Sequence, residues 1–247
     1  MTPNYFEPVA STVSADSLAA QVQLFLFRVP QEDAAIEQLG GVLDPTEAAR
    51  AAEFRHRQSR SNFIAARAGL RWLAASVMGI PAQSLKFGAT KTGKPFLMTN
   101  RNPPVDFNLS HSGEHCLIAL TMGVPVGVDI QEWHRQVDWR GIVERFFTAD
   151  ERKWIDETEE ADRRRRFYEC WTLKEAFMKA SGAGLAGGLE THSVRSACED
   201  SVHPLLREIA DEKDEWFLRK VPLELESYSA AVCWGRSGPS SFRLFRL

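Results

Sequence analysis

The sequence has few cysteines, no long apolar run and no strong excess of charge of either sign. Its four cysteines are far apart and form no C-x-x-C pair, which favours reduced thiols over a disulfide framework or a zinc site. The longest apolar runs, such as LFLF at 24–27, are too short to cross a bilayer. A net charge of −3 gives no basic field that would attract nucleic acid.

Several targeting and catalytic signatures are also missing. The N-terminal segment MTPNYFEPVASTVSAD has neither a basic start nor a long apolar stretch, so we expect no signal peptide and a cytoplasmic location. The chain contains no P-loop and no G-x-S-x-G turn. Ser110 and His111 would point to opposite faces of a strand, which argues against a Ser-His-Asp triad. His111 and His115 have a zinc-like spacing only on a helix, and His115 begins a strand.

The composition is that of an ordinary globular protein, with 44% hydrophobic and 26% charged residues. A length of 247 residues suits one large domain or two small lobes. Helices and short strands are mixed rather than strictly alternating, which predicts the α+β class. We expect strands at 22–29, 105–112, 115–122, 126–130, 226–234 and 241–247, and helices starting at 44–46 and covering 61–78, 139–147, 148–154 and 164–181.

The two halves of the sequence show a weak similarity in the order of their expected elements. Hairpin-like strand groups are expected at 105–130 and 217–247, one in each half. Each half also contains one long helix that ends in glycine, at MGI (78–80) and at SGAGL (181–185). Gly182 and Gly184 supply the backbone freedom that a helix C-cap needs. This similarity of the two halves indicates two similar lobes.

Three carboxylates from three elements are candidates for holding a cation. Asp129 ends the apolar strand VGVDI, Glu151 lies in the first turn of the helix at 148–154, and Glu175 lies in WTLKEAFMK. Such carboxylates suit Mg²⁺ when substrate phosphates complete its coordination. The alternatives are a turn residue for Asp129, a capping-box acid for Glu151 with Thr148, and a solvated i,i+4 ion pair for Glu175 with Lys179.

Other polar residues are candidates for binding an anion. NLSHS supplies Ser110 and His111, and GKP places Lys94 after a glycine that permits close backbone approach. The alternative for NLSHS is an ordinary Asn/Ser turn, with the strand running into a polar loop.

Taken in order, GKPFL (93–97), NLSHS (108–112), VGVDI (126–130), FFTADE (146–151) and WTLKEAFMKASGAGL (171–185) resemble the 4′-phosphopantetheinyl transferase superfamily, in its long Sfp-type form. The resemblance implies two pseudo-symmetric α+β lobes, each a small, mostly antiparallel sheet packed with a long helix. The active site would lie at their interface. The expected lobes are 1–124, with the coenzyme A motifs, and 125–247, with the metal and catalytic motifs.

The resemblance also implies an activity. Phosphopantetheine would pass from coenzyme A to a serine of an apo acyl or peptidyl carrier protein, with release of adenosine 3′,5′-bisphosphate and dependence on Mg²⁺, or Mn²⁺ in its place. The enzyme would be a cytoplasmic monomer that binds neither nucleic acid nor membrane. It would serve fatty acid, polyketide or nonribosomal peptide synthesis.

Roles for individual residues follow from the same resemblance. Glu175 is the candidate base, either itself or through a metal-held water. Lys179 would contact the phosphate and protonate the leaving group, and Glu151 would assist as a direct or water-mediated ligand. The implied metal ligands are Asp129, Glu151 and Glu175, and the implied coenzyme A contacts are Arg50, Lys94, Ser110, His111, Asp129, Glu175 and Lys179. Ser110 and His111 match positions that hold the 3′-phosphate.

The sequence departs from the family pattern at Gln131, where some relatives have Glu. An amide supplies no anionic oxygen, so Gln131 would at most be a neutral contact. Because carrier proteins are usually acidic, the RRRR run at 163–166 is a candidate docking surface, with a solvated helix face as the alternative. Two other functions stay open: a Mg²⁺-dependent phosphohydrolase or nucleotidyl transferase, and a coenzyme A- or carrier-binding module without catalysis.

Overall fold

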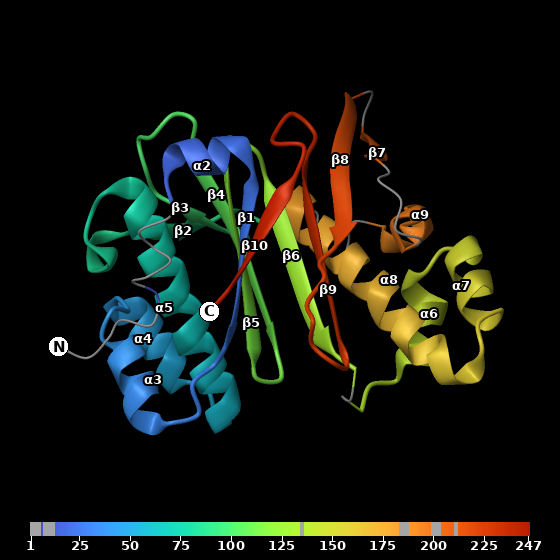
Figure 1. Cartoon of the computed structure of the whole chain (residues 1–247), viewed down its shortest axis with the longest axis horizontal. Helices are drawn as coiled ribbons and strands as arrows, with labels where there is room; N and C mark the ends of the chain where they lie inside the picture. Colours follow the sequence, from blue (N-terminus) through green and yellow to red (C-terminus); the bar gives the residue numbers. More distant parts are fainter. Residues whose placement is uncertain (1–5, 7–12, 134–135, 183–187, 199–203, 210–211) are drawn as a thin grey trace. The chain divides into compact units, whose positions relative to one another are not determined.

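The computed structural model describes Phe6 and residues 13–133, 136–182, 188–198, 204–209 and 212–247 (Figure 1). For 204–209 and 212–214 it describes the backbone only. The chain forms two compact units. Unit 1 comprises Met1–Gly123 and Ser241–Leu247, and unit 2 comprises Val124–Ser240. Each contains helices and a four-stranded sheet, so the predicted α+β class with two lobes is confirmed.

Unit 1 is built on a mixed sheet with the strand order β10-β1-β5-β4. Only the pairing of β10 with β1 is parallel. A separate two-stranded ribbon joins β2 to β3. The elements of this unit are α2 (Ala15–Ala20), β1 (Val22–Arg28), α3 (Asp33–Gly40), α4 (Pro45–Ala52), α5 (Arg57–Met78), η1 (Ala82–Ser84), β2 (Phe87–Ala89), β3 (Pro95–Leu97), β4 (Val105–Ser112), β5 (His115–Met122) and β10 (Phe242–Arg246).

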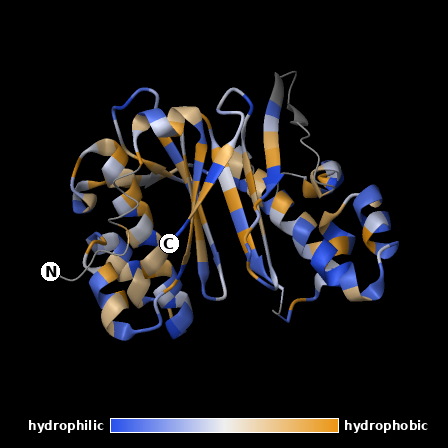
Figure 2. Cartoon of the chain, in the orientation of Figure 1, coloured by the Kyte–Doolittle hydropathy of each residue, from blue (hydrophilic) through white to orange (hydrophobic). Residues whose placement is uncertain are grey.

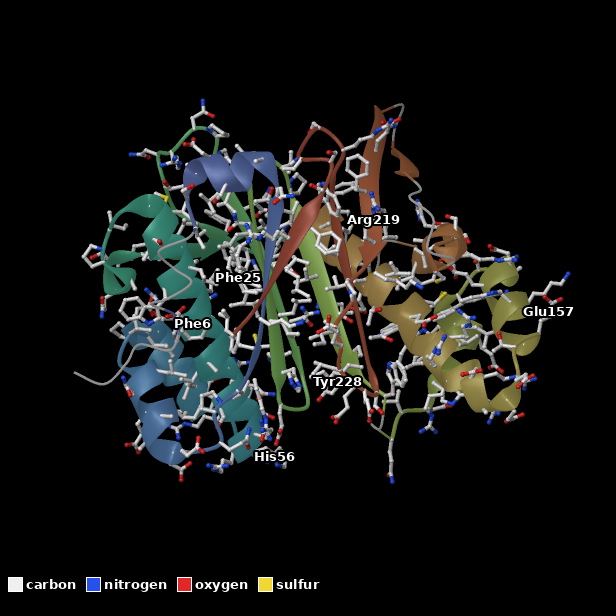
Figure 3. All side chains as sticks on the ribbon, in the orientation of Figure 1. Phe6, Phe25, His56, Glu157, Arg219 and Tyr228 are labelled. Carbon is white, nitrogen blue, oxygen red and sulfur yellow. The ribbon has the colours of Figure 1, made fainter. Side chains whose placement is uncertain are left out.

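Local sequence signals define the helices of unit 1. Asp44 caps α4 in a reciprocal capping box with Glu47, and Pro45 occupies the first turn, so this helix begins within the expected 44–46. The 22-residue helix α5 ends at Gly79, whose φ of 65° is the left-handed C-cap conformation. Helix α5 packs on β4 and β5. Phe6 and Phe25 belong to the core on this side of the sheet, and both are labelled in Figure 3.

Unit 2 has a fully antiparallel sheet with the order β6-β9-β8-β7. The 22-residue helix α8 lies along β6 and β9 and ends at Gly182, with φ 68° (Figure 1). The elements of this unit are β6 (Val126–Glu132), α6 (Trp139–Phe146), α7 (Ala149–Asp156), α8 (Glu160–Ser181), η2 (Leu189–Thr191), α9 (Arg195–Cys198), β7 (Pro204–Ile209), β8 (Glu212–Lys220) and β9 (Tyr228–Gly235).

The aromatic residues of the predicted catalytic helix pack as expected. Phe177 is buried in the core of unit 2, and Trp171 packs against that core. Phe147 is also buried, and its ring stacks on Phe167. Hydrophobic residues are concentrated along the strands, whereas α6 and α7 are largely hydrophilic on their visible faces (Figure 2).

The structure corrects the expected strand groups. Residues 105–130 do not form one group, because β6 pairs with β9 while β4 and β5 pair with each other. Residues 217–247 do not form one either, because β10 pairs with β1. The seven C-terminal residues therefore belong to unit 1, whereas the sequence assigned them to the lobe 125–247. Pairing between strands distant in sequence leaves no trace in local periodicity, which explains the error.

Two of the expected motifs can be compared with the structure. Strand β4 spans 105–112 as expected, so NLSHS is its last part rather than the Asn/Ser turn given as the alternative, and Ser112 pairs with His115 across a turn in which Gly113 has φ 54°. Of SGAGL, residues 183–185 lie outside the described part of the chain, and Gly184 is among them. In the described part, no helix is both long enough and apolar enough to span a membrane.

Candidate functional site

A glycine lets the long helix of unit 2 come very close to strand β6. A Cβ added to Gly127 would lie 2.2 Å from the Ala176 carbonyl oxygen and 2.3 Å from the Ala180 nitrogen. Both are backbone atoms, so no side chain fits there without moving α8. Side chains alternate along a strand, so Asp129 and Gln131 share the α8-facing side with Gly127.

Asp129 is only 1% exposed and accepts hydrogen bonds at both carboxylate oxygens. Lys179 Nζ lies 2.7 Å from Oδ1 and also donates to the Val128 carbonyl at 3.1 Å. Gln131 Nε2 donates to Oδ2 at 3.1 Å. A buried carboxylate is stable only with such compensation, and here an ammonium and an amide provide it.

Glu175 lies one helical turn before Lys179 and close enough to Asp129 for the two charges to interact. Burial, and then the negative charge of Asp129, raise the pKa of Glu175 to about 7, while Lys179 acts in the opposite direction. A carboxyl group with such a pKa is partly protonated near neutral pH and can exchange a proton with a substrate there. The structure thus brings together Asp129, Glu175 and Lys179, as the sequence analysis expected.

Glu151 belongs to a different arrangement within unit 2. Its carboxylate is fully buried and forms an ion pair with Lys174 Nζ at 2.8 Å. It also accepts hydrogen bonds from the backbone N–H groups of Thr148 (2.8 Å) and Val194 (2.7 Å). Lys174 is 1% exposed and donates to the Leu189 and His192 carbonyls.

These contacts of Glu151 differ from those of the metal ligand that the family resemblance implies. The capping-box alternative is realised with Thr148, and the carboxylate is further engaged by Lys174, so its oxygens tie α7, α8 and the segment after η2 together. Among the described residues, no three His, Cys, Asp or Glu side chains form a group able to hold a metal. The geometry thus gives no support to Glu151 as a third metal ligand beside Asp129 and Glu175.

The anion-binding candidates all lie in unit 1. Lys94 follows Gly93, whose φ is 87°, in the turn between β2 and β3. Its Nζ lies 3.2 Å from Asp106 Oδ2, and both side chains are largely buried. The carboxylate of Asp106 positions the ammonium, and the flexible lysine side chain allows it to reorient toward a phosphate.

Ser110 and His111 are neighbours on β4, so their side chains point to opposite faces of the sheet. Ser110 is 7% exposed and shares its face with Asn108 and Ser112, which are also buried. His111 is exposed. The structure therefore presents the two expected 3′-phosphate contacts on different sides of one strand.

Arg50 lies on the exposed surface of α4, in an ion pair with Glu53. Its guanidinium also lies over the ring of Phe54, 5.4 Å from the ring centre. The Arg50 head is thus near other side chains of its own unit but accessible to solvent.

Two contributors to the site were missed by the sequence analysis. A glycine inside a strand signals close backbone approach, so VGVDI already contained the sign that α8 would lie against Gly127. The second is Lys174, which is buried against Glu151. The local sequence does not predict the ion pair of Lys174 with Glu151, because the two residues lie on different helices.

Comparison with known proteins agrees with this geometry. Residues 125–233 match the family model described as the 4′-phosphopantetheinyl transferase superfamily, and residues 30–122 match that of a 4′-phosphopantetheinyl transferase N-terminal domain. The chain is 30% identical over 198 residues to the 4′-phosphopantetheinyl transferase psf-1 of Bacillus pumilus, covering 80% of this chain and 81% of the relative. It is 30% identical over 181 residues to a 4′-phosphopantetheinyl transferase of Bacillus subtilis, covering 73% and 76%.

The chain belongs to the 4′-phosphopantetheinyl transferase superfamily. It is therefore a member of a family of transferase enzymes. A further relative, HetI of Nostoc, is 29% identical over 170 residues and also named a 4′-phosphopantetheinyl transferase, with coverage of 68% of this chain and 72% of HetI. The predicted family and enzyme class are thus confirmed.

The carboxylates of unit 2 have the chemistry that a hard divalent cation requires. Asp129 and Glu175 supply carboxylate oxygens, and the Lys179 ammonium shows that a positive charge is stabilised beside Asp129. Mg²⁺ commonly takes one or two protein carboxylates and completes its shell with substrate phosphates and water. Two carboxylates are enough for such a site.

Proposed function

We propose that this protein moves 4′-phosphopantetheine from coenzyme A to a serine of an apo acyl or peptidyl carrier protein, with release of adenosine 3′,5′-bisphosphate. The observation that carries the proposal is the group of Asp129, Glu175 and Lys179, which combines two interacting carboxylates with an ammonium on β6 and α8. Family membership supplies the reaction class, and this group supplies the charges that phosphoryl transfer needs.

Asp129 and Glu175 would hold Mg²⁺, with Mn²⁺ as a substitute. When bound, the ion would neutralise the negative charge of the diphosphate as the leaving group departs. Gln131 would contribute no charge, and its hydrogen bond would keep the Asp129 carboxylate in orientation. Glu151 would support the position of α8 through Lys174.

Glu175 would accept the proton of the carrier serine hydroxyl as the serine oxygen bonds to the β-phosphorus of coenzyme A. The phosphorus–oxygen bond to adenosine 3′,5′-bisphosphate breaks in the same step. Lys179, one turn along α8, would contact the diphosphate and donate a proton to the departing oxygen.

Unit 1 would bind the nucleotide end of coenzyme A. The exposed His111 side chain would contact the 3′-phosphate, and Lys94 and Arg50 would supply further positive charge. Ser110, whose side chain is buried on the opposite face of β4, would contact the same phosphate through its backbone. The Lys94 ammonium lies 3.2 Å from Asp106 Oδ2, so it would have to interact with both Asp106 and the ligand. We further propose that the protein acts as a cytoplasmic monomer.

The test is the intact mass of an apo acyl carrier protein after incubation with this protein, coenzyme A and Mg²⁺. The carrier should gain the mass of one phosphopantetheine, and EDTA should prevent the gain. Asp129→Ala should abolish transfer while the protein stays folded, and Lys153→Met, on the exposed surface of α7, should leave transfer intact. Full transfer by the Asp129 variant would rule out the assignment of the site.

A further inference from the structure

The ammonium of Lys179 lies beside the oxygen atoms that a divalent cation would use. Its Nζ is 2.7 Å from Asp129 Oδ1 and 3.1 Å from the Val128 carbonyl oxygen. A carboxylate oxygen and a carbonyl oxygen are ligands of the hard type that Mg²⁺ and Mn²⁺ prefer. The Lys179 ammonium and a metal ion would therefore compete for the same oxygen atom of Asp129.

The two cations cannot share that oxygen without strong repulsion. Asp129 is 1% exposed, so little water screens charges placed beside it. The side chain of Lys179 is 27% exposed and ends a flexible four-carbon stem, so its ammonium can turn away while the backbone of α8 stays in place. A metal that binds Asp129 must displace the ammonium, and an anion near α8 would attract it.

We propose that Lys179 is an internal counter-ion of Asp129, which a divalent cation has to displace and which the diphosphate of coenzyme A draws away. The inference rests on the proposed function only in taking Asp129 as the cation site and coenzyme A as the anion. Its consequence is positive coupling: coenzyme A tightens metal binding because it removes the competing ammonium. By linkage, the metal tightens coenzyme A binding by the same factor.

Gln131 makes the inference testable at a single residue. Its amide holds Asp129 Oδ2 independently of Lys179, so replacing Lys179 leaves the hydrogen bond from Gln131 in place. Lys179→Met retains the apolar stem and removes the ammonium, together with its hydrogen bonds to Asp129 and the Val128 carbonyl. Lys153→Met is the matched control, because Lys153 lies on exposed α7 and pairs with Glu157.

The experiment measures Mn²⁺ binding by the electron paramagnetic resonance signal of free Mn²⁺ at pH 8.5, with and without coenzyme A. Without coenzyme A, Lys179→Met should bind Mn²⁺ about tenfold more tightly than the wild type, a factor within the usual range of site coupling. Adding coenzyme A should tighten Mn²⁺ binding to the wild type by about tenfold, and much less in the variant. Lys153→Met should behave as the wild type.

Each outcome separates this inference from the proposed function. Equal or weaker Mn²⁺ binding by Lys179→Met without coenzyme A would overturn the counter-ion role, even if the wild type modifies a carrier. Tighter binding by the variant, together with no carrier modification by the wild type, would keep the counter-ion role and refute the transferase proposal. If Lys179→Met does not fold, Lys179→Gln and the coenzyme A dependence of Mn²⁺ binding to the wild type decide the question.

Discussion

Replacing Glu175 by Gln should change how the stability of the EDTA-treated protein depends on pH. Burial and the charge of Asp129 raise the pKa of Glu175 from 4.5 to about 7. At about 1.4 kcal/mol per pKa unit, this shift corresponds to at most ~3 kcal/mol. Because the Glu175 side chain keeps some contact with solvent, we expect the measured effect to be about 1–2 kcal/mol.

The sign follows from proton binding. Between pH 4.5 and 7, the folded protein holds the Glu175 proton more tightly than the unfolded chain. Its contribution to the free energy of unfolding is therefore fully present below pH 4.5 and is lost as the pH rises through 7. Gln cannot ionise, so the variant should lose this slope and be more stable than the wild type at pH 8.5.

Urea unfolding at pH 5 and pH 8.5 measures the effect as a difference between the two proteins, which removes the contributions of all other groups. Glu157→Gln, at the exposed C-cap position that follows α7, is the control and should have the same stability as the wild type at both pH values. The reasoning would be refuted if the stability difference between Glu175→Gln and the wild type were the same at both pH values.

Three further predictions concern other residues. Gly127→Ala should destabilise the protein by roughly 2 kcal/mol or more in urea unfolding, because its Cβ would overlap backbone atoms of α8; unchanged stability would contradict the close approach. Lys174→Met should cost about 3–5 kcal/mol in the same assay, since it leaves Glu151 buried without its cation, and Glu151→Gln in addition should restore part of the loss. His111→Ala should raise the KM for coenzyme A more than for its 3′-dephospho form, and equal effects would remove His111 from the 3′-phosphate.

Local signals predicted the ends of the helices well. The start of α4 within 44–46, the Thr148–Glu151 capping box and the left-handed glycines at 79 and 182 all lie where the sequence predicted them. Each of these features depends on interactions between residues within one helical turn of each other. A short stretch of sequence is therefore enough to predict it.

The candidate site was predictable in part. Glu175 and Lys179 are one turn apart on α8, so the sequence alone indicates that they share a face. Asp129 joins them because β6 packs against α8 at Gly127, and the resemblance to the family named all three before the fold was known. Glu151 differs because its neighbours in the fold are Lys174 and the Val194 N–H, which decide its role by burial and charge pairing.

The sequence by itself determined the family, the α+β class and the types of residue available for chemistry, because motifs and periodicity are properties of adjacent residues. The tertiary structure decided which strands pair and which charges meet. It placed β10 beside β1, paired the Glu151 carboxylate with Lys174, and set the ammonium of Lys179 beside the Asp129 carboxylate. These outcomes depend on contacts between residues tens to hundreds of positions apart, where close packing and the cost of burying an unpaired charge select one arrangement.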